Sequence, residues 1–344
     1  MNHDMLQGIE DLDRMPVAEQ TSPLDQVPVI DVGEVFADSS SNAAVRAIDQ
    51  IAEACKTWGF FQVVNHGIPA SQIDEVWRQT HALFALPVEE KLAIQRDHAS
   101  PWGFYNKELT KNQRDKKEVF DYTREGVDPI YGKKNRWPAR PADFKPTMLA
   151  YLDGCTELSL NLLEAFCRGL DLPAKFMHPY FDGNHTGFMR LNYYPVEDPM
   201  AQLGGKQPAA DLGVHHHTDA GALTVLLQDE VSGLQVFRDG LWYDIPAIDG
   251  AMVINTGDMM QVWSNDIYKA AIHRVLAMDA RDRYSLPFFF NPAADCTVSP
   301  LPSVIGVDRP ALYRPIEWGS FRGKRSEGDY ADYGTEVQIS QYRK

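Results

Sequence analysis

Long apolar runs and positive charge are both scarce in this chain of 344 residues. No stretch approaches the roughly 18 apolar residues of a membrane-spanning helix, and the N-terminus lacks the apolar core of a signal peptide. Lysine and arginine together number 33 against 48 aspartates and glutamates, which gives a net charge of -15. These absences predict a protein with no membrane partner and no sequence-independent hold on nucleic acid.

Cysteine is scarce as well, and its placement bears on the compartment. The four cysteines are scattered along the chain and form no CxxC pair. Three of them lie in apolar helical patterns or beside a predicted strand. We therefore expect reduced thiols and a cytoplasmic location.

The order of the predicted elements divides the chain into four parts. Residues 1–25 are polar and acidic without periodicity, so we expect a mobile extension. Residues 26–180 form an N-terminal, helix-rich region, in which Gly169 is expected to end the longest helix. Residues 181–295 change to short strands between turn sequences, and residues 296–344 form a tail rich in proline and glycine.

This order of helices followed by strands predicts an α+β protein with a mainly β core. Evenly spaced short strands are typical of a sandwich or jelly roll, with the helices packed on one sheet. The strands expected in the core are 187–194, 222–228, 234–237, 241–245, 251–255, 258–263, 272–278 and 284–290.

One stretch of the core combines an imidazole with a carboxylate. His217 and Asp219 lie two residues apart, just before the aliphatic run Leu223–Leu227. On an extended backbone, residues i and i+2 point to the same face, so the two side chains project together. A 2-His-1-carboxylate Fe(II) site needs one further imidazole and leaves its remaining positions open.

The other histidines are weaker candidates on their own. His215 has the same strand parity as His217, so alternation alone does not exclude it, but it lacks a carboxylate partner. His273 is the only histidine after the motif, in a strand-like run 56 residues further on (273 − 217). A satisfied core histidine is the alternative interpretation of His273. His185 lies among polar residues and is expected to be solvated.

The last strong strand supplies a candidate for anchoring a co-substrate. Arg283 and Ser285 share one face by alternation, and the strand continues into the aromatic run Phe288–Phe290. A guanidinium beside a hydroxyl suits a terminal carboxylate, which would accept two or three charge-assisted hydrogen bonds. A surface arginine is the alternative, but the aromatic run does not belong to a surface strand.

Taken in order, these motifs resemble the plant-type, isopenicillin-N-synthase-like family of Fe(II)/2-oxoglutarate-dependent dioxygenases. The resemblance extends from about Val27 to Pro292. The HxD motif alone is weak, whereas the ordered set is specific. The set comprises VPVID at 27–31, WGFFQVVNHG at 58–67, NYYP at 192–195, HTD at 217–219, NTGD at 255–258, HRV at 273–275 and RYS at 283–285.

The resemblance implies a double-stranded β-helix that holds iron on three residues: His217, Asp219 and His273. It also implies that the distal carboxylate of 2-oxoglutarate is held by Arg283 and Ser285, with Tyr194 and Asn192 nearby. The residues that it places in the substrate pocket are Arg190, Phe104, Phe289 and Asn291.

The activity implied by the resemblance uses Fe(II), O2 and 2-oxoglutarate, with ascorbate helpful in vitro. A small-molecule substrate would be hydroxylated, desaturated or cyclised while 2-oxoglutarate is converted to succinate and CO2. An oxidase of the same fold that does not use 2-oxoglutarate is the alternative. A zinc hydrolase gives Arg283 and Ser285 no role, and an intact triad argues against a metal-free binding module. The sequence specifies neither the prime substrate nor the oligomeric state.

Overall fold

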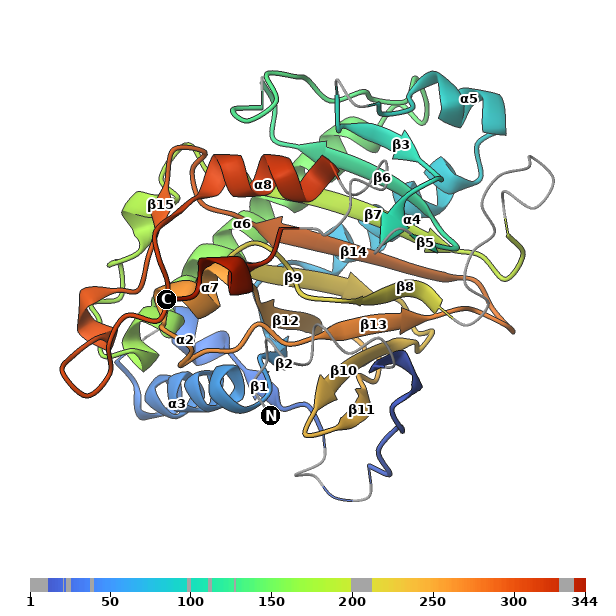
Figure 1. Cartoon of the computed structure of the whole chain (residues 1–344). Coiled ribbons are helices and arrows are strands. Elements are labelled where there is room, and N and C mark those ends of the chain that lie inside the picture. The colour runs from blue at the N-terminus through green and yellow to red at the C-terminus, as the bar shows by residue number, and fades with distance from the viewer. Residues whose placement is uncertain are drawn as a thin grey trace.

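The computed structural model describes residues 12–20, 22, 26–37, 40–97, 100–110, 113–126, 128–198, 212–327 and 337–344. Two β-sheets pack together, and helices cover the outer face of the larger one (Figure 1). No helix among these residues is long and apolar enough to cross a membrane.

The larger sheet has eight strands in the order β1-β2-β12-β9-β14-β7-β6-β3. Only β1 and β2 pair in parallel; the other neighbours are antiparallel. Its strands are β1 (Val29–Asp31), β2 (Phe60–Val64), β3 (Gly103–Tyr105), β6 (Glu118–Thr123), β7 (Phe188–Tyr194), β9 (Leu223–Gln228), β12 (Met252–Thr256) and β14 (Arg283–Phe290).

The smaller sheet has four antiparallel strands in the order β11-β10-β13-β8. Its strands are β8 (Leu212–His217), β10 (Leu234–Arg238), β11 (Leu241–Asp244) and β13 (His273–Leu276). From β8 to β14 successive strands alternate between the two sheets, apart from the β10–β11 hairpin, as in a jelly roll. Side chains from both sheets, among them Phe60, Leu226, Val236 and Val275, form the apolar layer between them. The predicted α+β architecture with a mainly β core is confirmed.

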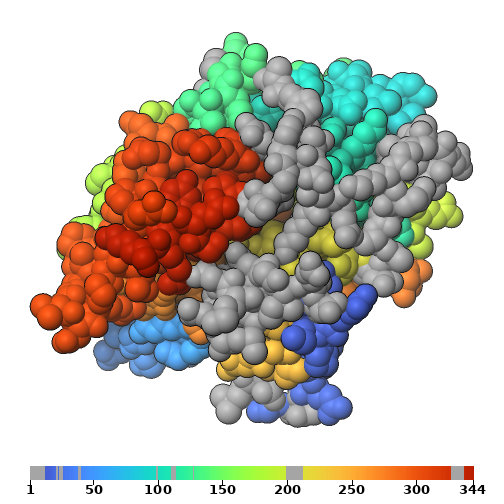
Figure 2. Space-filling model, in the orientation of Figure 1, coloured from blue at the N-terminus to red at the C-terminus, as the bar shows by residue number. Residues whose placement is uncertain are grey.

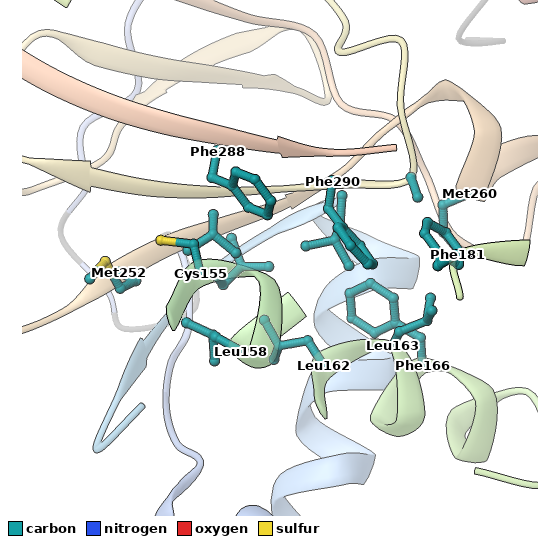
Figure 3. Close-up of a cluster of buried hydrophobic side chains, with 14 of the residues drawn as sticks. Cys155, Leu158, Leu162, Leu163, Phe166, Phe181, Met252, Met260, Phe288 and Phe290 are labelled. Atoms are coloured by element: carbon teal, nitrogen blue, oxygen red, sulfur yellow. The ribbon is translucent and has the colours of Figure 1, made fainter. Parts of the chain in front are cut away.

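Helix α6 (Phe144–Gly169) forms the main support of the larger sheet. Its buried side chains, among them Leu158, Leu162 and Phe166, meet Phe288 and Phe290 of β14 (Figure 3). Helix α3 (Asn42–Thr57) packs beside α6 and begins at the hydroxyl of Ser41, which accepts the amide of Ala44 at 3.1 Å. This helical layer buries one face of the sheet and leaves the other face to the site.

The remaining elements are short or peripheral. The C-terminal helix α8 (Trp318–Glu327) lies near β14 and β7 in Figure 1, and Figure 2 shows the red C-terminal segment beside a green segment from nearer the middle of the chain. The other helices are α2 (Gly33–Ala37), α4 (Ala70–Phe84), α5 (Val88–Ala93), α7 (Asp258–Trp263), α8 (Trp318–Glu327), η1 (Leu12–Arg14), η3 (His178–Tyr180), η4 (Pro302–Val304) and η5 (Ile339–Tyr342). The other strands are β4 (Leu109–Thr110), β5 (Gln113–Arg114), β15 (Thr297–Val298) and β16 (Ile316–Glu317).

Two local predictions were wrong. Residues 258–263, expected to be a strand, form the helix α7. The prediction failed because all six residues are buried, so their apolar side chains show no period that distinguishes a helix from a strand. Gly169, expected at the left-handed C′ position just beyond the helix, is instead the last residue of α6, and the left-handed residue after the helix is Asp171, with φ 58°. A Cβ on Gly169 would come within 2.4 Å of the hydroxyl of Tyr268, so close packing requires this glycine.

The expected mobile extension over residues 1–25 lies mostly outside the described residues. Within the part that is described, Leu12 is buried and its carbonyl accepts the indole N–H of Trp242 at 3.0 Å. Asp13 pairs with His216 at 2.7 Å. Residues 12–20 therefore pack against the smaller sheet and do not extend away from the core.

Candidate metal and co-substrate site

Two imidazoles and one carboxylate meet between the sheets. His217 ends β8, Asp219 follows it, and His273 begins β13 directly opposite His217 in the strand register. Their ligand atoms all lie within 4.8 Å of one another. Nε2 of His217 is 3.8 Å and Nε2 of His273 is 3.7 Å from Oδ1 of Asp219. The structure thus brings together the three side chains predicted to hold iron.

Hydrogen bonds fix which atom of each side chain faces the centre of this triad. Nδ1 of His217 lies 2.8 Å from the carbonyl of His215, and Nδ1 of His273 lies 3.1 Å from the carbonyl of Ala271. Since a carbonyl can only accept, each Nδ1 carries the proton and each Nε2 keeps its lone pair for a ligand bond.

The carboxylate of Asp219 is oriented in the same way. Its Oδ2 accepts from the hydroxyl of Thr224 at 2.6 Å and from the amide of Asn255 at 2.7 Å. Oδ1 therefore remains for a metal. The sequence prediction missed Thr224 and Asn255. These two residues are cross-strand partners on the neighbouring strands β12 and β9. Both lie in sequence motifs to which the prediction gave no role.

Burial sets the charge state of the triad without metal. Desolvation, followed by the neighbouring His273, lowers the pKa of His217 to about 3. Burial alone would raise the pKa of Asp219, but the two imidazoles and the hydrogen bonds from Thr224 and Asn255 lower it overall. Neutral imidazoles with one carboxylate are the donor set that Fe(II) takes in open 2-His-1-carboxylate sites.

The adjacent histidines point elsewhere. His215 is buried with its Nδ1 3.3 Å from Asp115, and His216 is buried beside Asp13. Strand parity alone did not show whether His215 or His217 is the metal ligand. The structure distinguishes them, because His217 is the last residue of β8 and, of the two, only His217 lines the cavity with Asp219 and His273.

An inner cavity extends from the triad between the sheets. Besides the triad it is lined by the four predicted co-substrate residues: Arg283, Ser285, Tyr194 and Asn192. Ser285 and Asn192 are cross-strand partners, and the Asn192 amide donates to the Ser285 hydroxyl at 3.2 Å. The structure therefore gathers all four at one end of the cavity.

Arg283 is a buried cation, with 1% of its surface exposed. Its Nε donates to the carbonyl of Val231 and its Nη2 to Oε1 of Gln228, both at 3.1 Å. Among the described residues, Nη1 has no hydrogen-bond partner and no carboxylate lies within 4.0 Å of the guanidinium. A buried positive charge with an unused donor is costly unless an anion meets it. The distal carboxylate of 2-oxoglutarate fits this requirement.

An outer pocket adjoins the inner cavity and shares six lining residues with it: Lys117, Arg190, Val214, His217, Asp219 and Phe289. Arg190, Phe289 and Asn291, three of the residues expected in a substrate pocket, line it. Phe104 does not: it lies on β3, beside β6, and is fully buried in the core, with the ammonium of Lys91 5.4 Å from its ring. The mixed composition of the sequence around it gave no sign of this burial.

The sequence prediction also missed a cluster of buried charges beside the triad, the Glu108 cluster: Arg96, Glu108, Asp115, Lys117, Asp121 and Arg190. Glu108 pairs with Arg96 at 2.6 Å and with Lys117 and Arg190 at 2.7 Å. Burial alone would raise the pKa of Glu108, but these three cations lower it well below its usual value. Lys117, just before β6, and Asp121 within it have the same strand parity, but nothing in the sequence indicates that Glu108 and Arg96 reach them.

Comparison with known proteins gives the same family twice. The profile described as the 2OG-Fe(II) oxygenase superfamily matches residues 185–292. A second profile, described as non-haem dioxygenase in morphine synthesis N-terminal, matches residues 27–140. The Arabidopsis thaliana Protein DMR6-LIKE OXYGENASE 2 is 33% identical, covering 90% of this chain and 86% of its own. Flavonol synthase 1 of Crocosmia x crocosmiiflora is 32% identical over 87% and 86%.

Solved structures agree. JOX2 in complex with 2OG, Fe and JA has a TM-score of 0.77 and 27% identity, covering 96% of this chain and 93% of that one. A full-length Neurospora crassa protein in complex with alpha-KG and thymine has a TM-score of 0.78 and 25% identity, over 90% and 99%. These relatives confirm the predicted double-stranded β-helix core.

Proposed function

The chain belongs to the 2OG-Fe(II) oxygenase superfamily, and from this premise we propose which of its residues hold the iron and the 2-oxoglutarate. The enzyme is an Fe(II)/2-oxoglutarate-dependent dioxygenase that uses O2 to oxidise a small molecule and releases succinate and CO2. We propose that the iron ligands are Nε2 of His217, Oδ1 of Asp219 and Nε2 of His273. Arg283 and Ser285 bind the distal carboxylate of 2-oxoglutarate, beside Tyr194 and Asn192.

The unpartnered Nη1 of Arg283 is the observation that supports the co-substrate assignment most directly. The Tyr194 ring lies under the guanidinium, 5.2 Å from Cζ, and holds its plane. A carboxylate that accepts from Nη1 and from the Ser285 hydroxyl would compensate the buried charge. The far end of 2-oxoglutarate is then fixed, and its 2-oxo acid end is directed along the cavity toward the triad.

Iron, when bound, supplies the centre at which O2 and the 2-oxo acid react. The residues of this chain contribute orientation and exclusion of water. Thr224 and Asn255 hold Asp219, and the carbonyls of His215 and Ala271 hold the two imidazoles. Phe60, Leu226 and Val275 line the cavity with apolar surface, which keeps the reaction away from bulk water.

The prime substrate binds in the outer pocket, from which His217 and Asp219 are reached without passing Arg283. Flavonol synthase 1 and the structure solved with JA support an organic substrate of low molecular weight. We also propose a cytoplasmic location, which the four buried, unpaired cysteines support.

Succinate release tests the proposal. The purified enzyme, supplied with Fe(II), ascorbate and O2, should convert 2-oxoglutarate to succinate, slowly on its own and faster with a prime substrate. His273→Ala should release none, whereas His216→Ala, which changes an imidazole facing away from the cavity, should retain turnover. Wild-type turnover by His273→Ala would refute the ligand assignment.

A further inference from the structure

The outer pocket is positively charged, although the chain carries a net charge of -15. Four cationic side chains line it: Lys117, Arg190, Arg322 and Arg325. Its only two carboxylates among the described lining residues are Glu108 and Asp219. Asp219 belongs to the proposed iron site, and Glu108 is already held by three cations. Lys117 and Arg190 also pair with Asp115 and Asp121, and Arg325 lies 4.0 Å from Asp258. Arg322 therefore carries the positive charge that the pocket leaves for a ligand.

Arg322 of α8 is the cation best placed to meet such a molecule. Its guanidinium packs over the ring of Phe188, with Cζ 5.0 Å from the ring centroid. Among the described residues, no carboxylate lies within the 4.0 Å of an ion pair with it. Stacking holds the plane of a guanidinium and leaves its N–H edge open to a planar acceptor.

Part of the wall of the outer pocket is aromatic. Phe188 and Phe289 stack with their ring centroids 4.8 Å apart. Trp318 completes this wall, and its indole N–H is already donated to the hydroxyl of Thr186 at 2.7 Å. With that donor satisfied, Trp318 offers the pocket its ring rather than a polar group. This surface suits an aromatic or hydrocarbon body.

We propose that the prime substrate is a small monocarboxylate with an apolar body, and that its carboxylate pairs with Arg322. The inference rests on the proposed function, because it assigns the outer pocket to the prime substrate. One open guanidinium edge matches the two oxygens of one carboxylate. The aromatic wall holds the body of the molecule beside His217 and Asp219, where oxidation takes place. Amines are excluded, because an ammonium group would be desolvated beside the guanidinium of Arg322, with no free carboxylate among the described lining residues.

Matched probes of one size test this charge requirement. The anaerobic enzyme loaded with Fe(II) and 2-oxoglutarate is titrated in a calorimeter with phenylacetate, 3-phenylpropanoate and 4-phenylbutanoate. The primary amide and the amine that correspond to each acid are titrated separately for comparison. At least one acid should bind roughly tenfold or more tightly than its amide, which is the scale of one hydrogen bond to a charged group. The matching amine should not bind.

Variants assign the preference to Arg322. Arg322→Gln should weaken binding of the acid by roughly 10- to 100-fold and leave the amide unchanged. Arg322→Lys should be intermediate, because an ammonium keeps the charge but not the planar fork. Arg238→Gln is the matched control: Arg238 also stacks on a ring, 4.2 Å from that of Trp58, but does not line the pocket.

The proposal is overturned if no acid binds, if acid and amide bind equally, or if Arg322→Gln keeps the wild-type preference. Binding of 2-oxoglutarate and probe-independent succinate release are measured on the same samples. Their absence would refute the proposed function itself. Their presence without a preference for acids would refute only the substrate class.

Discussion

Two buried arginines, Arg96 and Arg283, have nearly the same surroundings and differ in one respect. Arg96 is 3% and Arg283 1% exposed, and each lies over a tyrosine ring, Tyr105 at 4.8 Å and Tyr194 at 5.2 Å. The guanidinium of Arg96 pairs with Asp121 and Glu108. Within the described part of the chain, the guanidinium of Arg283 donates hydrogen bonds only to a carbonyl and an amide oxygen and forms no ion pair. The protein supplies the anion for one arginine, and a ligand must supply it for the other.

Loss of an iron ligand has the largest expected effect, because the 2-oxoglutarate that Arg283 anchors then has no iron to react at. His217→Ala, Asp219→Ala and His273→Ala should each abolish turnover, since two ligands remain where three are needed. Anaerobic addition of Fe(II) and 2-oxoglutarate should give no visible charge-transfer band. His216→Ala is the control and should keep both the band and the activity.

Arg283→Leu should raise the 2-oxoglutarate concentration needed for half-maximal turnover by roughly a hundredfold or more. Removing one partner of a buried charge pair costs about 3–5 kcal/mol of binding free energy. At about 1.4 kcal/mol for each tenfold change in affinity, this corresponds to a factor of roughly a hundred or more. Iron content, measured on the same samples, should not change. Ser285→Ala should have a smaller effect, about one hydrogen bond to a charged group, or 1.5–3 kcal/mol. An unchanged 2-oxoglutarate requirement in Arg283→Leu would contradict the assignment.

Arg96→Leu should reverse this pattern, with a loss of stability and little change in the 2-oxoglutarate requirement. Removing Arg96 leaves the Glu108 cluster with an excess carboxylate in a buried place, at a cost of about 3 kcal/mol. In urea unfolding, Arg283→Leu should differ from wild type by no more than about 1 kcal/mol, because the lost hydrogen bonds are offset by removal of an uncompensated charge. Equal destabilisation by the two substitutions would mean that the two arginines play the same role.

His185 is a third buried titratable group, and it has neither a carboxylate nor a ligand to meet. It was expected to be solvated, but it is 9% exposed, and burial lowers its pKa to about 4. Because the folded pKa lies below the unfolded value of about 6.5, the unfolded chain binds the proton first. The free energy of unfolding should therefore fall between pH 6.5 and 4, by about 3 kcal/mol from this group.

His185→Asn provides the matched test of this acid sensitivity. Nδ1 of His185 accepts the amide of Gly187 at 3.2 Å, and an asparagine oxygen can accept the same i+2 amide without titrating. Urea unfolding at a series of pH values should show a shallower decline for the variant between pH 6.5 and 4. The same decline in both proteins would show that other groups cause it.

The sequence predicted two pairs of site residues from local signals, whereas His273, Tyr194 and Asn192 were assigned only through the family resemblance. His217 with Asp219, and Arg283 with Ser285, share a strand face at a spacing of two, which any extended backbone reproduces. The choice between His215 and His217 depended on where β8 ends, which alternation does not specify. Burial without periodicity likewise concealed the helix over 258–263.

The Glu108 cluster could not be predicted, because it is assembled by long-range pairing. Asp121 and Arg190 become direct cross-strand neighbours only in the register of β6 with β7. Arg96 and Glu108 reach the same place from loops on either side of β3. Charged residues in a stretch of mixed composition normally indicate solvent exposure, and only the tertiary pairing explains why these are buried.

The choice between two 2-oxo acids tests the role of Arg283 most directly. 2-Oxopentanoate has the chain length of 2-oxoglutarate and keeps its 2-oxo acid end, but it lacks the distal carboxylate. Titrated anaerobically into the Fe(II) enzyme, 2-oxoglutarate should bind roughly a hundredfold or more tightly than 2-oxopentanoate. Arg283→Leu should bind the two acids about equally. A variant that still prefers 2-oxoglutarate by the wild-type factor would show that another residue holds the distal carboxylate.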